Sequence, residues 1–206
     1  LRSKVKMAAT VDVSGWQKRE IAPRRTSKIL VGSSDKVVVI GASTGGTVAL
    51  RHMINEFPSD MPGTVVVQHM PETFTRLFAE SLTKTAAVDV REAEDNDRVL
   101  TGRVLVAPGG KQLKVVRSGG EYRVKVYDGP KVNGHSPSVD TLFTSAADHV
   151  GSNAVGVILT GMGRDGADGM LRMRRTGAST FAQDERTSVV FGMPREAYSN
   201  GGAQRL

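Results

Sequence analysis

The chain contains no cysteine, which excludes disulfides, thiolate catalysis and cysteine-ligated zinc or iron–sulfur sites. It also has no apolar run near the roughly 18–20 residues that a membrane-spanning helix needs. The first residues, Leu1 to Lys4, lack the apolar core of a signal peptide. Together these absences predict a cytoplasmic protein without membrane insertion.

Positive charge is concentrated at the start of this chain of 206 residues, whose net charge is +7. Residues 1–31 hold eight lysines and arginines against two carboxylates, which leaves a charge near +1 for the remainder. A domain that binds nucleic-acid phosphates normally carries a large positive charge, and residues after 31 are nearly neutral. We therefore expect no nucleic-acid partner. Residues 1–31 also lack the apolar periodicity of a helix or strand. We predict a basic interdomain linker at residues 1–34, in which Trp16 is either exposed or docked, and one folded domain at residues 35–206.

From Lys36 onward, apolar segments of strand length alternate with segments of helix length. This alternation predicts an α/β fold with a mostly parallel, doubly wound (Rossmann-like) sheet and helices on both faces. The pattern around Gly119 and Gly120 predicts an appended antiparallel hairpin. The expected strands are 36–41, 64–68, 87–91, 103–107, 113–117, 122–127, 154–160 and 178–182. The expected helices are 45–56, 73–84, 139–149, 166–175 and 194–199.

The segment GASTGG, residues 41–46, joins the first expected strand to the first expected helix. It fits the pattern G-x-S-x-G, in which a tight turn exposes a nucleophilic serine, here Ser43, above a sheet. A phosphate-binding loop is also rich in glycine. However, Ser43 replaces the second glycine of a dinucleotide fingerprint, no carboxylate ends the second strand, and no lysine follows Gly46. The segment therefore favours a nucleophile.

Three expected strands lead into residues that can carry hydrolytic chemistry: Ser43 and His69 at the ends of two strands, and Asp165 in the loop after a third. Because parallel strands present their carboxyl ends at one edge of a sheet, these side chains are expected to converge. Acyl transfer uses such a trio, in which a histidine takes the proton of a serine and a carboxylate orients the histidine. The chain order Ser, His, Asp differs from the order Ser, Asp, His of α/β-hydrolases.

Each of these residues also has a purely structural explanation. Ser43 is compatible with capping the following helix, and His69 with bonding a backbone carbonyl at a strand end. Asp165 is compatible with a helix cap, and nearby Asp168 competes for any catalytic role. The four histidines of the chain show no H-E-x-x-H or equivalent spacing, so no metal site is expected. Acyl transfer by a serine, a histidine and an aspartate needs no cofactor, and none is expected.

Six motifs together closely resemble the catalytic domain of the chemotaxis protein-glutamate methylesterases, the CheB family. The resemblance covers residues 35–203, and the motifs stand in the family's order. They are GASTGG (41–46), QHMP (68–71), VAPGG (106–110), SPSVDTLF (136–143), LTGMGRDG (159–166) and AQDERTSVVFGMP (182–194).

The resemblance implies a serine hydrolase of chemotaxis adaptation that demethylates glutamate methyl esters on the cytoplasmic helices of chemoreceptors. The products are methanol and a free carboxylate, and deamidation of receptor glutamine is a related reaction. It further implies that Ser43 is the nucleophile, that His69 is the general base and then acid, and that Asp165 orients His69.

The remaining site residues follow partly from the resemblance and partly from donor geometry. The resemblance points to the backbone N–H of Met162 as an oxyanion donor, and the place of Thr44 near a helix N-terminus makes it a second candidate. We expect Arg164, His135 and Ser138 to contact the substrate helix, although His135 is equally compatible with a plain loop residue.

Members of the family carry a receiver domain before the catalytic domain, and it obstructs the site until it is phosphorylated. This domain and the receptor helices are therefore the expected partners, although no receiver-like region precedes the linker of this chain. Two alternatives remain open. One is a general small-molecule serine esterase or amidase, which needs an enclosed apolar pocket. The other is a noncatalytic nucleotide- or anion-binding regulator that uses GASTGG as its anion site.

Overall fold

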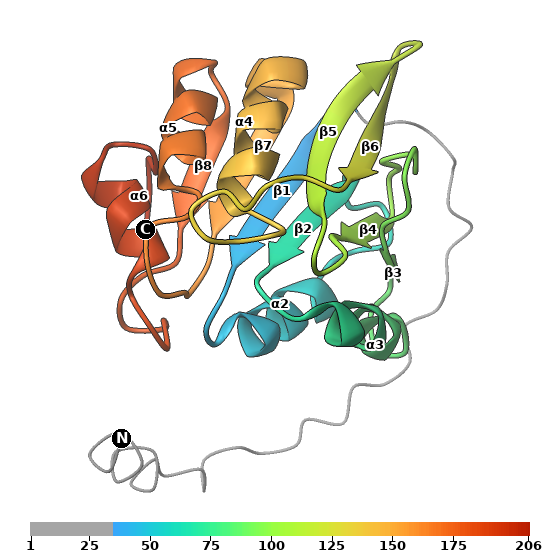
Figure 1. Cartoon of the computed structure of the whole chain (residues 1–206), viewed down its shortest axis with the longest axis horizontal. Helices are drawn as coiled ribbons and strands as arrows, with labels where there is room; N and C mark the ends of the chain where they lie inside the picture. Colours follow the sequence, from blue (N-terminus) through green and yellow to red (C-terminus); the bar gives the residue numbers. More distant parts are fainter. Residues whose placement is uncertain (1–34) are drawn as a thin grey trace, which may run out of the picture.

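Six strands form an all-parallel sheet in the computed structural model, which describes residues 35–206. The strand order is β3-β4-β2-β1-β7-β8 (Figure 1). The predicted linker, residues 1–34 with Trp16, lies outside the described residues. The strands of this sheet are β1 (Val37–Ala42), β2 (Thr64–Gln68), β3 (Asp89–Glu92), β4 (Arg103–Val106), β7 (Ala154–Ile158) and β8 (Ser179–Ala182).

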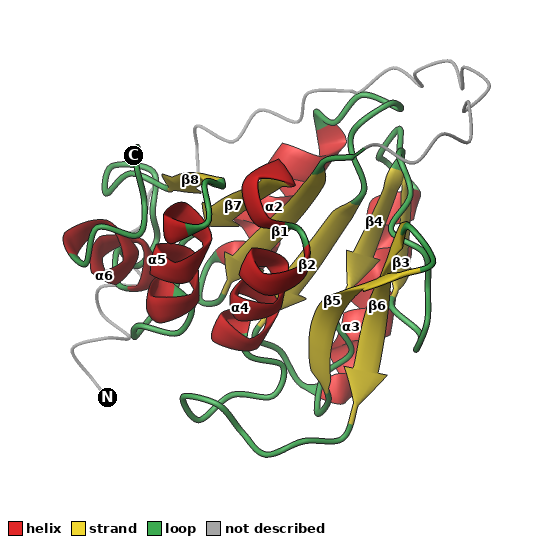
Figure 2. Ribbon diagram, turned by 90° about the horizontal axis from the view of Figure 1, so that it is seen from above, coloured by secondary structure: helices red, strands yellow, loops and turns green. Residues whose placement is uncertain are grey.

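Helices cover both faces of the sheet, as the sequence predicts (Figures 1 and 2). On one face lie α2 (Gly46–Asn55) and α3 (Glu72–Thr83). The other face carries α4 (Val139–His149), α5 (Ala167–Arg175) and α6 (Met193–Ser199).

Strand β1 separates two hydrophobic cores, one on each face. Val37 and Val39 belong to the core beneath α4, α5 and α6, whereas Val38 and Ile40 belong to the core beneath α2 and α3. Every residue of β1 is buried, which explains why this strand is a continuous apolar run without polar alternation.

The predicted hairpin is present as β5 (Gln112–Ser118) and β6 (Glu121–Tyr127). Its two-residue turn, Gly119-Gly120, has φ angles of 57° and 85°, which glycine adopts without strain. The hairpin forms a second sheet of its own and packs beside α4 (Figure 2), where the Val115 N–H donates to Ser145 Oγ at 2.9 Å. Backbone hydrogen bonds also join β6 to the segment before β4, for example from Val99 N to Tyr122 O at 2.9 Å.

All eight expected strands and all five expected helices occur, with ends displaced by at most two residues. Strand β7 ends at Ile158, earlier than predicted, although hydrogen bonds from Leu159 N to Gly41 O and from Ser43 N to Thr160 O continue its pairing. A short 3₁₀ turn, Gly151–Asn153, was not predicted. Within residues 35–206, no helix has the length and apolarity needed to cross a membrane.

The sheet order brings the three candidate catalytic residues to one edge. β1 lies between β2 and β7, so the loops after these three strands are neighbours. Backbone hydrogen bonds continue the pairing beyond the strands: His69 N donates to Ala42 O at 3.0 Å, and Ser43 N donates to Thr160 O at 3.0 Å. The crevice at the point where the strand order reverses is the usual ligand site of an open α/β sheet.

Replacing Gly41 with alanine tests how tightly α4 packs on β1. An added Cβ at Gly41 would lie 2.2 Å from Val139 Cγ1, inside the buried core. We expect Gly41→Ala to lower the free energy of unfolding by about 2 kcal/mol, because overpacking displaces neighbouring side chains. Urea denaturation measures this change.

The matched control is Gly119→Ala, where an added Cβ meets nothing within 4 Å. We expect Gly119→Ala to lower the free energy of unfolding by only about 1 kcal/mol, which is the strain of an alanine at a positive φ angle. The double variant Gly41→Ala/Val139→Ala should lose less stability than the two single variants added together. Strict additivity would contradict the proposed contact.

Candidate active site

A tight turn places Ser43 between β1 and α2. The Ser43 N–H donates to Thr160 O, and Ser43 O accepts from Gly46 N at 2.8 Å, which closes the turn. Gly45 has φ 82°, a left-handed conformation that glycine adopts without strain. The Ser43 side chain is partly exposed at the sheet edge.

Close packing explains the glycines around Ser43. A Cβ at Gly46 would lie 2.1 Å from Gln68 Oε1, and one at Gly161 would lie 2.8 Å from Ser43 Cβ. The Gln68 side-chain amide in turn donates to Ser43 O at 2.9 Å and to His69 O at 3.1 Å. The glycines thus let two neighbouring strand ends approach the serine turn, and no bound phosphate is needed to account for them.

His69 and Asp165 form a buried pair beside this turn. His69 Nε2 lies 2.8 Å from Asp165 Oδ2, and the two side chains are 8% and 1% exposed. Because an ionised carboxylate can only accept, Nε2 carries the proton of a neutral His69 ring. The other ring nitrogen, Nδ1, is buried and has no hydrogen-bond partner in the described structure. Its lone pair is therefore available to a hydroxyl proton.

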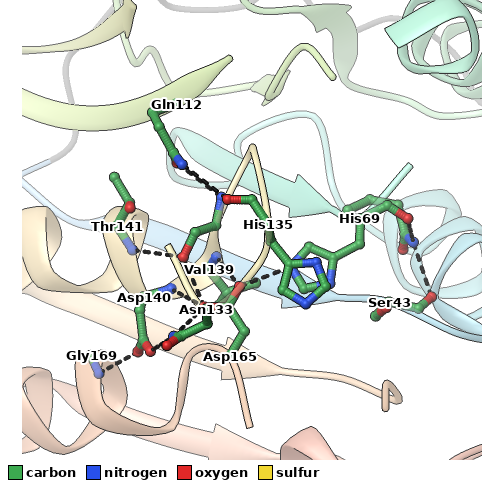
Figure 3. A network of polar contacts seen from close by, with 12 residues as sticks. Ser43, His69, Gln112, Asn133, His135, Val139, Asp140, Thr141, Asp165 and Gly169 are labelled. Carbon is green, nitrogen blue, oxygen red and sulfur yellow. Dashed lines mark hydrogen bonds and ion pairs between the residues drawn. The ribbon is translucent and has the colours of Figure 1, made fainter. Parts of the chain in front are cut away.

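Five donors point at the Asp165 carboxylate (Figure 3). Two of them are free N–H groups in the first turn of α4, where the helix dipole favours negative charge. Burial alone would raise the pKa of Asp165, but the hydrogen bonds lower this pKa to about 2. The five donors are His69 Nε2 (2.8 Å), Asn133 Nδ2 (2.9 Å), Ser138 Oγ (2.8 Å), Val139 N (2.7 Å) and Asp140 N (3.3 Å).

A second buried carboxylate, Asp140, lies next to Asp165. Asp140 accepts from Gly169 N at 2.6 Å and from Asn133 Nδ2 at 2.5 Å (Figure 3). Asn133 Nδ2 thus donates to both carboxylates. Burial raises the pKa of Asp140, and the negative charge of Asp165 acts in the same direction. The shared amide reduces the repulsion between these two groups.

The ring of His135 stacks on the ring of His69. The ring centroids are 3.7 Å apart and the planes differ by 7° (Figure 3). Burial and the nearby His69 lower the pKa of His135, which favours its neutral form. His135 was predicted as a substrate contact or a plain loop residue, and the structure brings its ring against the histidine of the candidate site.

The two predicted oxyanion donors lie on the loops that flank Ser43. In the described structure, neither the Thr44 N–H nor the Met162 N–H donates a hydrogen bond to another protein group. The Met162 loop follows Gly161, whose Cα approaches Ser43 closely. Met193 N donates to Gly161 O at 2.8 Å and fixes that loop. Both N–H groups are thus available to a developing oxyanion.

The other two predicted substrate contacts, Arg164 and Ser138, differ in their exposure. Arg164 is exposed at the rim and pairs with Asp168 at 2.8 Å, which gives Asp168 a surface role outside the buried cluster. Ser138 is fully buried, caps α4 through its contact with Thr141 N, and donates to Asp165. This burial disfavours a direct contact between Ser138 and a substrate and favours support of Asp165.

Sequence reasoning missed Asn133, Asp140 and Gln68 as parts of this site. Asp140 lies within the SPSVDTLF motif, Gln68 is the first residue of the QHMP motif, and Asn133 lies shortly before SPSVDTLF. No spacing rule would have shown that the Asn133 amide reaches two carboxylates, because that contact depends on the fold of the loop before α4.

An apolar cleft of about 690 Å³ opens beside α2, on the face opposite α4. Gly45 and Thr160 line it together with Phe181 and Val189, but Ser43 and His69 do not. The small-molecule esterase hypothesis expects an apolar pocket around the nucleophile. This cleft does not meet that expectation.

Comparison with known proteins gives a consistent result. A family model described as CheB methylesterase matches residues 38–206. A protein-glutamate methylesterase/protein-glutamine glutaminase of Syntrophotalea carbinolica is 56% identical and covers 100% of this chain and 60% of its own length. The Salmonella typhimurium protein of the same name is 50% identical, and the match covers 100% of this chain and 59% of the Salmonella protein. The chain thus spans about 60% of the length of these curated relatives.

A solved structure agrees with the fold. The crystal structure of the Thermotoga maritima CheB methylesterase catalytic domain matches with a TM-score of 0.81 and 39% sequence identity. The match covers 84% of this chain and 92% of that chain. The Rossmann-like α/β fold with a hairpin is therefore confirmed.

The lowered pKa of Asp165 predicts a pH-dependent contribution to stability. The folded-state pKa, about 2, lies below the ordinary value of 3.8, so the ionised carboxylate adds stability above pH 3.8. This contribution is lost as the pH falls through about 2 and amounts to roughly 2 kcal/mol. We expect the stability difference between the parent chain and Asp165→Asn to narrow by that amount between pH 5 and pH 2, as measured by urea unfolding.

Asp168→Asn is the control for this experiment, because Asp168 is exposed and paired only at the surface. Its stability difference from the parent should stay within about 0.5 kcal/mol across the same pH range. If the difference in free energy of unfolding between the parent chain and Asp165→Asn changed with pH as little as that of Asp168→Asn, the buried, ionised state of Asp165 would be contradicted.

Proposed function

The chain belongs to the CheB methylesterase family, and we propose that it hydrolyses glutamate methyl esters on chemoreceptor helices and releases methanol. The observation that carries this proposal is the buried pair of His69 and Asp165 beside the Ser43 turn, with His69 Nδ1 left unpartnered. The names of the relatives, protein-glutamate methylesterase/protein-glutamine glutaminase, supply the substrate class.

In the proposed mechanism, Ser43 Oγ attacks the carbonyl carbon of the ester while His69 Nδ1 takes its proton. Asp165 stabilises the imidazolium that forms and holds its ring orientation. The N–H groups of Met162 and Thr44 stabilise the oxyanion of the tetrahedral intermediate. His69 then gives the proton to the methoxide as it leaves, which produces methanol and a glutamyl ester of Ser43.

Water completes the reaction. It attacks the glutamyl ester of Ser43 as His69 takes a proton, and the bond to Ser43 Oγ breaks when His69 returns that proton to the serine. The free glutamate carboxylate is the second product. Arg164, exposed at the rim of the site, is our candidate for contact with the receptor helix.

We also propose that the same residues deamidate receptor glutamine, because the relatives' names include protein-glutamine glutaminase. The acyl-enzyme and its hydrolysis are identical in this case. Ammonia replaces methanol as the leaving group, so protonation by His69 is needed for departure.

Location and domain arrangement complete the proposal. We infer that the protein acts in the cytoplasm, where receptor helices of this class present their methylation sites. Residues 35–206 are the proposed catalytic domain and residues 1–34 the proposed linker to a receiver domain. The length of the relatives beyond the region matched here supports a further domain in full-length proteins.

Methanol release from a methylated chemoreceptor cytoplasmic fragment tests the methylesterase proposal. We expect the parent chain to release methanol and Ser43→Ala and His69→Ala to lose at least about 10³-fold in kcat/KM, since each removes a reacting group. Asp165→Ala should also be strongly impaired. Ser118→Ala, at the far hairpin turn, serves as the matched serine control and should retain full activity.

Circular dichroism of each variant separates lost chemistry from lost folding. A folded parent chain that is inactive on several methylated receptors would overturn the substrate assignment. Full activity of a folded Ser43→Ala variant would overturn the role of Ser43 as the nucleophile. The same variants, assayed for ammonia release from a receptor fragment with glutamine at the modified positions, test the deamidation proposal.

A further inference from the structure

The turn of residues 132–135 lies directly over the candidate base. Val132 and His135 exchange two backbone hydrogen bonds, of 2.9 and 3.0 Å, which makes a closed turn. Asn133 and Gly134, at its tip, both have positive φ angles, 52° and 81°. The turn therefore has a defined shape, and it projects the His135 ring onto the ring of His69 (Figure 3).

Two side-chain amides anchor this turn, one on each side. The Asn133 side chain donates to Asp140 and Asp165. On the other side, Gln112, which is 1% exposed, donates from Nε2 to Pro130 O and His135 O, each at 3.0 Å. Its Oε1 accepts from the backbone N–H of Ser138 at 3.0 Å. The position of the His135 backbone is therefore set by the strand β5 that carries Gln112.

Among the described residues, the ring nitrogens of His135 form no hydrogen bond with the protein, so the ring contributes its flat face. That face covers one side of His69, while Asp165 holds Nε2 at the edge of the same ring. A ring restrained at its face and at one edge cannot tilt freely. Its remaining nitrogen, Nδ1, therefore keeps one direction.

Charge imposes a further requirement on this stack. During the proposed reaction His69 becomes an imidazolium, and a second cation at 3.7 Å would oppose that change. The charged groups that act on His135 are His69, Asp165 and Lys131. Burial and the charges of His69 and Lys131 lower the pKa of His135, against the opposite effect of Asp165. A neutral aromatic face over a cation is attractive instead.

We propose that His135 is a positioning residue whose flat, neutral ring holds the His69 imidazole in the orientation needed to take the Ser43 proton. This inference deepens the proposed function and rests on it. It replaces the predicted contact between His135 and the substrate helix. The ring face is the required feature, and the ring nitrogens are not.

Two variants of His135 separate the ring from its nitrogens. His135→Ala removes the stack, and we expect kcat for methanol release to fall about 10- to 100-fold with KM within about twofold of the parent, as for a misaligned reacting group. His135→Phe keeps a flat ring without a charge and should return kcat to within about threefold of the parent. His149→Ala, at the exposed end of α4, is the matched histidine control and should leave both constants unchanged.

A readout that does not depend on the receptor distinguishes this proposal from the proposed function. The rate at which a fluorophosphonate probe labels Ser43 reports nucleophile activation alone. We expect the labelling rate to fall in His135→Ala and to recover in His135→Phe, while thermal unfolding checks that both variants fold. If this pattern holds but the parent releases no methanol, the substrate assignment fails and the positioning role stands.

Three outcomes would overturn the positioning role. One is a His135→Phe variant that is folded but as slow as His135→Ala, which would show that a ring nitrogen is required. Another is a rise in KM without a fall in kcat, which would identify His135 as a substrate contact. The third is a probe-labelling rate that is the same in the parent chain and His135→Ala.

Discussion

A negative charge kept out of water in the loop between β7 and α5 is the constraint on which the site depends. An isolated buried carboxylate is strongly unfavourable, so the Asp165 charge persists only because five donors surround it. These donors come from the end of β2, the loop before α4 and the first turn of α4. Satisfying one charge therefore fixes the relative positions of three segments that are distant in sequence: the end of β2, the start of α4 with the loop before it, and the loop that carries Asp165.

The same constraint explains the small residues around the site. Val139, the first residue of α4, packs against both Gly41 and Gly166, so the helix N-terminus can reach Asp165. On the other side of β1, Gly46 lets the Gln68 amide pass to the Ser43 turn. Close approach of backbone segments is thus a condition for the polar network and for the exposure of Ser43 at its edge.

The sequence predicted the parts of the structure that follow from periodicity and strand ends. Ser43 and His69 stand directly after apolar strands, Asp165 lies in the loop that follows a third strand, and parallel pairing then brings these loops together. The roles of Asn133 and His135 were not predictable in this way. They depend on the irregular loop before α4, whose course is fixed by hydrogen bonds from the distant Gln112. Neither hydrophobic pattern nor local motif encodes such long-range amide contacts.

The position of β1 at the centre of the sheet also has a consequence for folding kinetics. The pair of His69 and Asp165 joins positions separated by 96 residues, and both flank a strand that is itself paired on two sides. Contacts of such long sequence separation require the closure of long chain loops, which slows folding. The site is complete only when β7 has docked beside β1. Recovery of hydrolysis during refolding would therefore report the assembly of the whole sheet, whereas spectroscopic signals of its helices would report earlier, more local steps.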